Sequence, residues 1–279
     1  MDCNPLFISS LNSGSNGNCY YVGNAQEAVL IDAGISCRET EKRMFRLGLS
    51  MTKVKAVFIS HEHTDHIKGL TVLAKKYNLP VYITPGTLNG SRLDIPETLI
   101  YNFSGQRSIQ IGSLTVSCFP KVHDAAEPHS FMVTCGAVKV GIFTDLGIVC
   151  DQLINHFQQC DAAFLEANYD EDLLHKGNYP YFLKRRISGG LGHLSNKQAL
   201  ELFINFRHAR LSHLLLSHLS RENNNPELVA ELFNQHANGT RIIVASRHEE
   251  TPVFTIGAAV RSSAETFPQT HSDPQLQRL

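Results

Sequence analysis

The sequence lacks the cysteine spacing of a zinc ribbon and that of a disulfide framework. Its 279 residues include seven cysteines, an odd number, and no Cys-x-x-Cys pair occurs. Cys135 and Cys160 lie in or beside apolar runs, which is typical of small core residues. This cysteine usage favours a reducing compartment.

Long apolar runs are also missing. No run reaches the length of a membrane span, and Met1 to Pro5 contain no basic segment followed by a long apolar one. We therefore expect a cytoplasmic protein without a membrane partner.

The chain has almost no excess of charge of either sign. Its formal net charge is −1, which excludes a polycation that coats nucleic acid through charge alone but leaves room for a local basic groove. The longest basic cluster is Lys184-Arg185-Arg186. It fits a solvent-exposed face as well as a phosphate contact.

What the chain does contain is apolar strand-like segments with helices between them. The hydrophobic content of 42% supplies a sizeable core. We expect one domain over residues 1–261 and a polar, flexible tail over residues 262–279. The expected strands cover residues 6–11, 19–23, 27–32, 56–59, 80–84, 109–116, 117–120, 131–135, 139–144, 161–165, 214–217, 241–245 and 253–256.

Several helices are expected from apolar spacing and capping residues. Residues 36–47 have Ser36 as an N-cap and apolar spacing at Met44, Phe45 and Leu47. Ser195 caps a helix that ends at Phe206, with Leu200, Phe203 and Ile204 facing the core. Further helices are expected over residues 68–77, 148–158 and 226–236, and a turn at Pro85-Gly86.

The most informative stretch is Ser60-His61-Glu62-His63-Thr64-Asp65-His66. It follows the apolar run Ala56 to Ile59, which predicts a buried strand. Neutral imidazoles and a carboxylate are good ligands for zinc and similar metals. His61, His63, Asp65 and His66 therefore predict a metal site in the turn that leaves this strand.

Ligand-type side chains recur directly after other apolar runs. They are Asp32, His123, Asp145 and His218. A site built where strand ends converge needs such contributions from distant segments. Asp32, which is followed by Gly34, could support the metal ligands from behind or could merely cap a turn.

This series of residues resembles the metallo-β-lactamase superfamily over residues 6–256. The resemblance implies an α/β (α+β) fold, a four-layer αββα sandwich of two mixed β-sheets flanked by helices. It assigns His61, His63 and His123 to one metal, and Asp65, His66 and His218 to a second, with Asp145 bridging both. A bridging carboxylate favours two divalent ions of one kind, Zn²⁺ or Mn²⁺.

A second pair of motifs resembles those of tRNase Z. Leu165-Glu166-Ala167-Asn168 and Gly192-His193-Leu194-Ser195 are similar to its Glu-Ala-Thr and Gly-His-Ser segments, with Asn168 where that family has Thr. The resemblance implies that Glu166 orients His193 and that His193 handles the proton of the leaving oxygen. The alternatives are a surface carboxylate at Glu166 and a helix-start hydrogen bond at His193.

The narrowest resemblance is to the YycJ-type (WalJ-type) nucleases. It is carried by residues 13–18, 30–34, 61–66, 123–128, 192–196 and 217–226. Members of that family are described as 5′-to-3′ exonucleases acting on DNA, without the β-CASP insertion of larger relatives. Asp145 and His218 are 218 − 145 = 73 positions apart, which leaves no room for such an insertion.

We therefore expect a dinuclear metal phosphodiesterase that acts on nucleic acid, on DNA rather than RNA. A hydroxide between the metals would attack phosphorus, and Asp65, Glu166 and His193 would serve catalysis. The weaker candidates for substrate contacts are Ser15, Asn16, Asn18, Asn168, Asn223, Asn224 and Asn225.

Two other functions stay open at this point. One is hydrolysis of a small thioester, lactone or cyclic phosphodiester on the same fold, and the other is binding without catalysis. The complete ligand set argues against the second. The sequence leaves the metal, the polarity of cleavage and the oligomeric state open.

Overall fold

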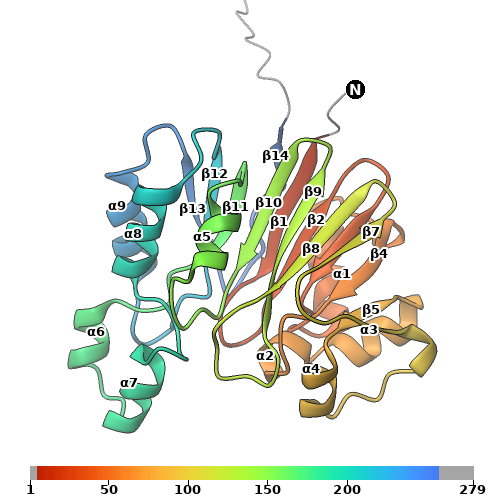
Figure 1. Ribbon diagram of the computed structural model, residues 1–279, viewed down its shortest axis with the longest axis horizontal. Coiled ribbons are helices and arrows are strands. Elements are labelled where there is room, and N and C mark those ends of the chain that lie inside the picture. The colour runs from red at the N-terminus through yellow and green to blue at the C-terminus, as the bar shows by residue number, and fades with distance from the viewer. Residues whose placement is uncertain (1–4, 258–279) are drawn as a thin grey trace, which may run out of the picture.

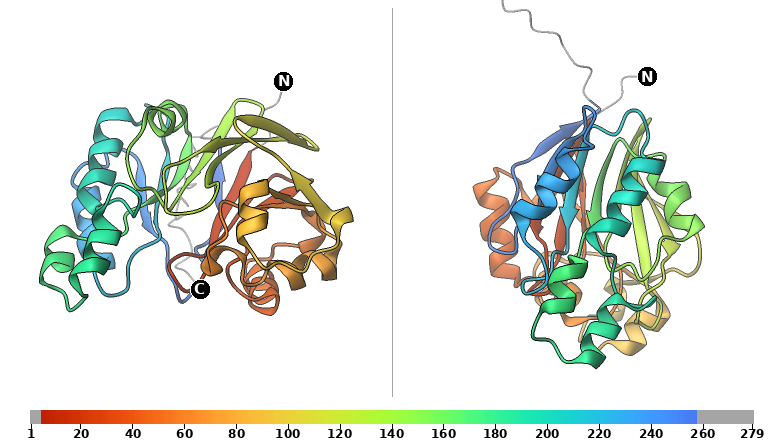
Figure 2. Two further views of the ribbon diagram at one scale, coloured as in Figure 1. Left: turned by 60° about the horizontal axis from the view of Figure 1, so that its bottom comes forward. Right: turned by 90° about the vertical axis from the view of Figure 1, so that its left-hand side faces the viewer.

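The computed structural model of this chain describes residues 5–257. Two seven-stranded β-sheets pack face to face, and helices cover the outer face of each (Figures 1 and 2). The layers follow the order helix, sheet, sheet, helix, which confirms the predicted αββα sandwich. The predicted polar tail, residues 262–279, lies outside the described residues.

The first sheet contains the N-terminal strands. Its antiparallel part comprises β14, β1, β2 and β3, and the part from β3 to β6 is parallel. In spatial order its strands are β14 (Phe254–Ile256), β1 (Leu6–Asn12), β2 (Cys19–Gly23), β3 (Ala28–Ile31), β4 (Val54–Phe58), β5 (Val81–Ile83) and β6 (Ile100–Asn102).

The second sheet repeats this plan with later strands. Strands β7 to β10 are antiparallel and β10 to β13 are parallel. In spatial order they are β13 (Arg241–Val244), β12 (His213–Ser217), β11 (Ala162–Glu166), β10 (Val138–Phe143), β9 (His129–Cys135), β8 (Leu114–Pro120) and β7 (Arg107–Ile111).

Helices fill the connections between the strands. None of those within residues 5–257 combines the length and the apolarity needed to span a bilayer. The α-helices are α1 (Cys37–Arg46), α2 (Thr64–Ile67), α3 (Leu70–Tyr77), α4 (Pro85–Gly90), α5 (Asp151–Phe157), α6 (Glu171–Lys176), α7 (Tyr181–Ser188), α8 (Asn196–Phe206) and α9 (Pro226–Asn234).

Three apolar clusters hold the layers together. The central one lies between the sheets and draws on both, with Tyr20 and Phe58 from the first sheet and Phe131 and Phe164 from the second. The other two pack α1 and α3 against the first sheet, and α5, α8 and α9 against the second. We propose that both sheets form one domain, because the central cluster is shared.

The strand polarity brings the predicted site residues to one edge. Strands β3, β4, β10, β11 and β12 run in parallel segments, and side chains that follow such strands gather at a common edge. Strands β3 and β11 are buried along their whole length, which explains their largely apolar sequences, whereas β4 and β10 each contain one lysine.

Two apolar residues of the predicted helices lie on the surface. Ile204 of α8, which was predicted to face the core, is 41% exposed, and Phe45 of α1, part of the apolar spacing that predicted this helix, is 84% exposed. Helical spacing alone gives a stripe of candidate positions, and the actual contact with the sheet is narrower than that stripe.

Three segments differ from the sequence expectation. Pro85 opens α4 rather than a turn, with Thr84 as N-cap, because proline is well suited to the first helical position. The strands predicted over residues 109–120 are divided at Gly112, which has a φ of 58°, rather than at Ser117. The short elements β6, α6 and α7 were not predicted.

The central cluster can be tested with two phenylalanine variants. Phe131→Ala removes a fully buried ring that packs edge-on against Phe58 at 5.8 Å, and we expect it to lower the free energy of unfolding by about 3–5 kcal/mol. The matched change Phe45→Ala, on the surface, should alter it by less than about 0.5 kcal/mol. Urea unfolding of both variants in EDTA measures this; equal losses would contradict the placement of Phe45.

Candidate metal centre and catalytic pocket

The backbone turns sharply where three site residues leave their strands. Asp32, Asp145 and His218 have φ values of 62°, 55° and 56°. A left-handed backbone costs a residue other than glycine roughly 1–3 kcal/mol, and such residues cluster at functional sites. Asp145 and His218 line the same pocket, so the turns bring ligand atoms from different strands together.

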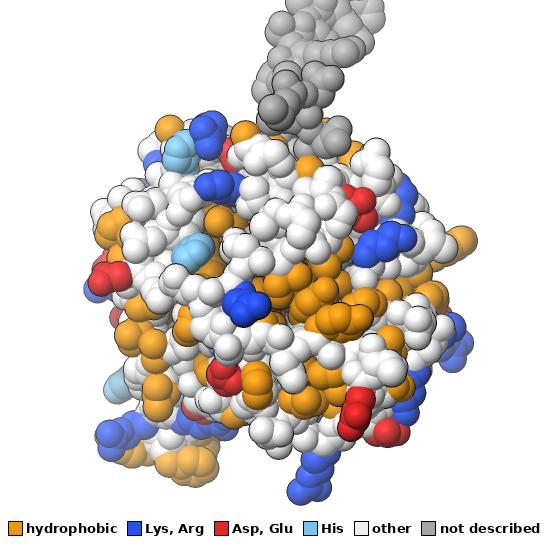
Figure 3. Space-filling view, turned by 45° about the vertical axis from the view of Figure 1, so that its right-hand side comes forward, with side chains coloured by type: hydrophobic (Ala, Val, Ile, Leu, Met, Phe, Trp, Pro, Cys, Tyr) orange, Lys and Arg blue, Asp and Glu red, His pale blue; other side chains and the backbone are white. Residues whose placement is uncertain are grey.

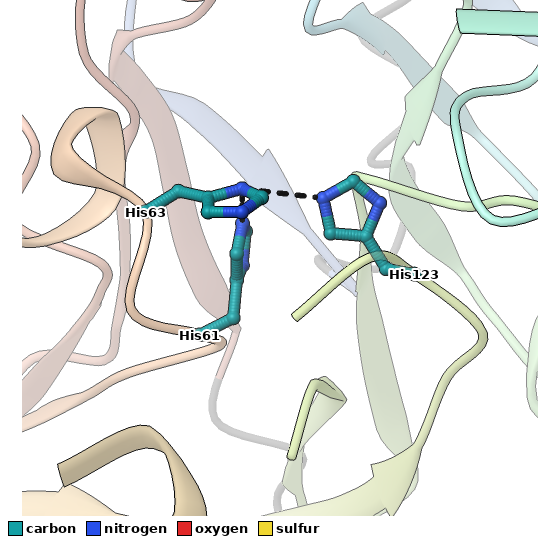
Figure 4. A group of neighbouring side chains, drawn as sticks. All are labelled: His61, His63 and His123. Atoms are coloured by element: carbon teal, nitrogen blue, oxygen red, sulfur yellow. Dashed lines mark hydrogen bonds between the residues drawn. The ribbon is translucent and has the colours of Figure 1, made fainter. Parts of the chain in front are cut away.

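Three histidines converge at one side of this pocket (Figure 4). The Nε2 atom of His61 lies 3.0 Å from Nδ1 of His63, which lies 3.4 Å from Nε2 of His123. Burial lowers the pKa of His61 well below its usual range and that of His123 to about 4. Neutral rings offer lone pairs, as ligation of a divalent metal requires.

A second group lies beside the first. The Nε2 atoms of His66 and His218 lie 3.5 Å and 3.4 Å from Oδ2 of Asp65. Asp145 stands next to both groups, because its carboxylate is 3.2 Å from His66, 3.5 Å from His218 and 3.8 Å from His123. The structure thus brings together all seven residues that the resemblance assigned as metal ligands.

The donor atoms of this cluster fit divalent metal ions. Oδ2 of Asp145 is buried and has no hydrogen-bond partner among the described residues. Burial opposes the ionisation of Asp145, but His218 and His66 outweigh it and hold the pKa of this carboxyl well below its usual range. A buried carboxylate without a donor and convergent imidazole nitrogens are the chemistry of a cation site.

Asp32 supports this cluster from behind. Its carboxylate accepts hydrogen bonds from the backbone N–H and the hydroxyl of Ser60, at 2.8 Å and 2.9 Å, and lies 2.7 Å from Nδ1 of His66. It therefore fixes the start of the histidine-rich turn and leaves Nε2 of His66 facing Asp65 and Asp145. Such outer contacts orient ligands and tune their affinity.

The imidazoles of His123 and His218 are oriented in the same way. Nδ1 of His123 is 3.0 Å from the carbonyl oxygen of Gly192, and Nδ1 of His218 is 3.1 Å from Oε1 of Glu166. In each case an oxygen accepts the N–H of one ring nitrogen, which turns the other nitrogen toward the cluster.

Glu166 joins this cluster to His193. Oε1 of Glu166 lies 2.8 Å from Nδ1 of His193, and Oε2 accepts the N–H groups of Leu146 and Leu194. Burial opposes the ionisation of Glu166, but His193 and His218 outweigh it and lower its pKa to about 2. The carboxylate is thus ionised, and Nε2 of His193 is the ring nitrogen left for a substrate.

The pocket that these residues line has a volume of about 420 Å³. Part of its wall was not foreseen from the sequence. Tyr179, Leu183, Arg186 and Ile187 line it from α7 and the segment before it. Arg186 belongs to the basic cluster Lys184-Arg185-Arg186, but the sequence alone did not show whether this cluster contacts phosphate or only solvent.

Two further unforeseen residues hold the loops of the site. Lys121 is buried and its Nζ donates to the carbonyl oxygen of Thr144, beside Asp145. Glu62 was given no role from the sequence. Its Oε1 accepts the N–H of Ala126 at 2.8 Å, which links the turn of His61 to His66 to the loop of His123.

The predicted substrate contacts divide into two groups. Ser15 and Asn168 line the pocket, and Asn168 also donates to the carbonyl oxygen of His218. The others are not among the lining residues of this pocket. Asn18 is buried against Asp65 and His66, Asn16 donates to the carbonyl oxygen of Arg247, Asn223 and Asn224 are buried, and Asn225 caps α9.

The comparisons with known proteins agree with this geometry. The model of the β-lactamase superfamily domain matches residues 27–218. Over 233 residues the chain is 37% identical to exodeoxyribonuclease YycJ of Bacillus anthracis, which covers 82% of this chain and 88% of the relative. It is 32% identical over 227 residues to exodeoxyribonuclease WalJ of Streptococcus pneumoniae, covering 79% of this chain and 84% of the relative.

A solved structure shows the same fold at low sequence identity. The metallo-β-lactamase fold protein YhfI from Bacillus subtilis superposes with a TM-score of 0.69 and 17% identity, covering 90% of this chain and 99% of that protein.

The support from Asp32 can be tested by one conservative change. Asp32→Asn keeps the shape of the side chain and tolerates a positive φ, but it replaces a carboxylate oxygen by a donor that faces other donors. We expect the affinity for Mn²⁺ or Zn²⁺ to fall about 10–100-fold, measured by equilibrium dialysis and elemental analysis. Asp161→Asn, at an aspartate that hydrogen-bonds Lys139 and Arg210, is the control; equal affinities for both variants would refute the role of Asp32.

Proposed function

This chain belongs to the β-lactamase superfamily, and on that premise we propose that it is a divalent-metal-dependent exonuclease that degrades DNA in the 5′-to-3′ direction. The observation that carries the proposal is the Glu166–His193 pair, which shares one pocket with the histidine and aspartate cluster. The names of the curated relatives support DNA as the substrate. The direction rests on the resemblance to the YycJ-type family.

We propose two metal ions, Zn²⁺ or Mn²⁺, held by this cluster. His61, His63 and His123 would hold one and Asp65, His66 and His218 the other, with Asp145 between them. When bound, such ions supply an activated water and neutralise charge on the phosphate.

His193 supplies the proton that the leaving oxygen needs. Its Nδ1–H donates to Oε1 of Glu166, and this hydrogen bond turns Nε2 of the ring toward the substrate. The ring then gives the proton on Nε2 to the departing alkoxide, a poor leaving group without such help. Glu166 thus positions the acid and does not touch the substrate.

The pocket also contains groups suited to binding the strand. The side chains of Ser15 and Asn168 can donate to phosphate or sugar oxygens, and Arg186 at the pocket wall balances the negative charge of Asp124. Contacts of this kind position the strand without reading its sequence.

A cytoplasmic location is consistent with this activity. The six cysteines within the described residues are free thiols, five of them buried, which fits a reducing compartment.

Two single variants separate metal binding from proton transfer. Asp65→Ala should lose metal and DNA cleavage together, because it removes a ligand. His193→Ala should keep its metal and lose turnover by about 10²-fold or more. Cleavage is followed with end-labelled DNA in the presence of Mn²⁺ or Zn²⁺, and the metal bound to each variant is measured separately. The wild type should release a 5′ label before a 3′ label. Wild-type turnover by His193→Ala would disprove the assignment of the acid.

A change of leaving group tests the acid role directly. p-Nitrophenolate leaves with little need of a proton, so His193→Ala should hydrolyse bis(p-nitrophenyl) phosphate within about threefold of the wild-type rate while its DNA cleavage falls about 10²-fold. Equal losses on both substrates would show that His193 acts elsewhere. Wild-type protein that cleaves only the small diester would instead be a small-molecule phosphodiesterase.

A further inference from the structure

A short helical arm, residues 170–190, connects β11 to α8 and contains α6 and α7. It projects beside the edge of the sandwich that carries the site (Figures 1 and 2). Its inner side lines the catalytic pocket through Leu183, Arg186 and Ile187. Nε of Arg186 donates to Asp124 at 2.7 Å, which fastens the arm to the residue next to His123.

The outer side of the arm exposes aromatic rings. Tyr181 is 76% exposed and Phe182 is 73% exposed, and within residues 5–257 only Phe45 among the other aromatic side chains is more exposed. Two neighbouring rings in solvent, one turn from a catalytic pocket, are unfavourable for an isolated protein and mark a binding surface.

The charge of α7 indicates what this surface binds. The helix contains Lys184, Arg185 and Arg186 and no acidic residue. Tyr181, Lys184 and Arg185 border a hollow of about 550 Å³, which Glu171 of α6 also lines, and the Arg185 guanidinium lies 6.0 Å from the centre of the Tyr181 ring. In Figure 3, basic and apolar side chains stand together in the lobe at the lower left, where the arm lies, while basic residues elsewhere on that face are scattered.

We propose that the arm is a platform for single-stranded DNA, on which Tyr181 and Phe182 stack against unpaired bases and Arg185 contacts the backbone. The proposal rests on the nuclease function proposed above and names the form of its substrate. Aromatic rings stack on bases of any sequence once these are unpaired, and cations beside them follow the phosphates. Tyr179 and Arg186 of the same segment line the catalytic pocket, so a strand that passes around α7 from the platform would enter that pocket.

A second copy of this chain is the competing occupant. A symmetric contact through α7 would place its cations against the same cations of the partner, which disfavours association. A polyanionic strand meets no such repulsion from α7, so the charge of this helix favours DNA over self-association.

The test uses the full-length protein with its metal. Tyr181→Ala/Phe182→Ala should raise KM for a 20-nucleotide single strand about tenfold or more, the loss expected for base stacking, with kcat changed by less than about twofold. Phe45→Ala, which removes an even more exposed ring from α1, is the matched control and should leave KM unchanged. Arg185→Gln should reduce the slope of log KM against log salt by about 0.7.

Separate readouts distinguish the outcomes. Bis(p-nitrophenyl) phosphate is too small to extend from the catalytic pocket to Tyr181 and Phe182 on the outer side of the arm, so its hydrolysis by the wild type reports the catalytic centre without the platform. If the wild type fails on this diester and on DNA, the proposed function fails. If the wild type cleaves DNA and the double variant has the KM of Phe45→Ala, the platform is refuted. A shift of the double variant from dimer to monomer in light scattering would refute it in favour of self-association.

Discussion

A single buried carboxylate, that of Glu166, is the interaction on which the site depends. It receives Leu146 N–H, Leu194 N–H and the Nδ1 atoms of His193 and His218, from three separate connections of the second sheet. A carboxylate buried in this way is stable only because its donors are complete. The same contacts that satisfy its charge therefore also fix His218, a proposed metal ligand, and His193, the proposed acid, relative to each other.

The direction of the strands brings these donors together at one edge of the sandwich. Parallel strands from both halves end at one edge, and the chain turns there through left-handed residues at Asp32, Asp145 and His218. The strain of these turns is balanced by contacts made only at the edge, such as Asp32 with Ser60 and His66. Convergence of ligands thus follows from topology, and their orientation follows from a surrounding layer of hydrogen bonds.

The sequence was informative where chemistry and order along the chain coincide. His61 to His66, His123, Asp145 and His218 follow apolar runs, so their convergence could be predicted from the order of residues alone. Contacts that depend on packing could not be predicted from the sequence. Phe45 and Ile204 share the helical spacing of core residues, yet the sheet does not reach them. Asn18 looked like a phosphate contact, but lies behind the ligands because the loop folds inward. The arm was missed since its helices are short and lack a buried stripe.

The arm also explains how a pocket lined by carboxylates can accept a phosphate. Asp124 lies at the pocket beside His123, with Oδ1 3.3 Å from Nε2 of that histidine. Unpaired, this anion would repel the substrate. Burial opposes the ionisation of Asp124, but the hydrogen bond from Arg186 outweighs this effect and lowers the pKa of Asp124. The carboxylate is therefore negatively charged, and the positive charge of Arg186 balances it. The contact that fastens the arm to the site is therefore also the one that reduces the repulsion between the pocket entrance and the proposed nucleic-acid substrate.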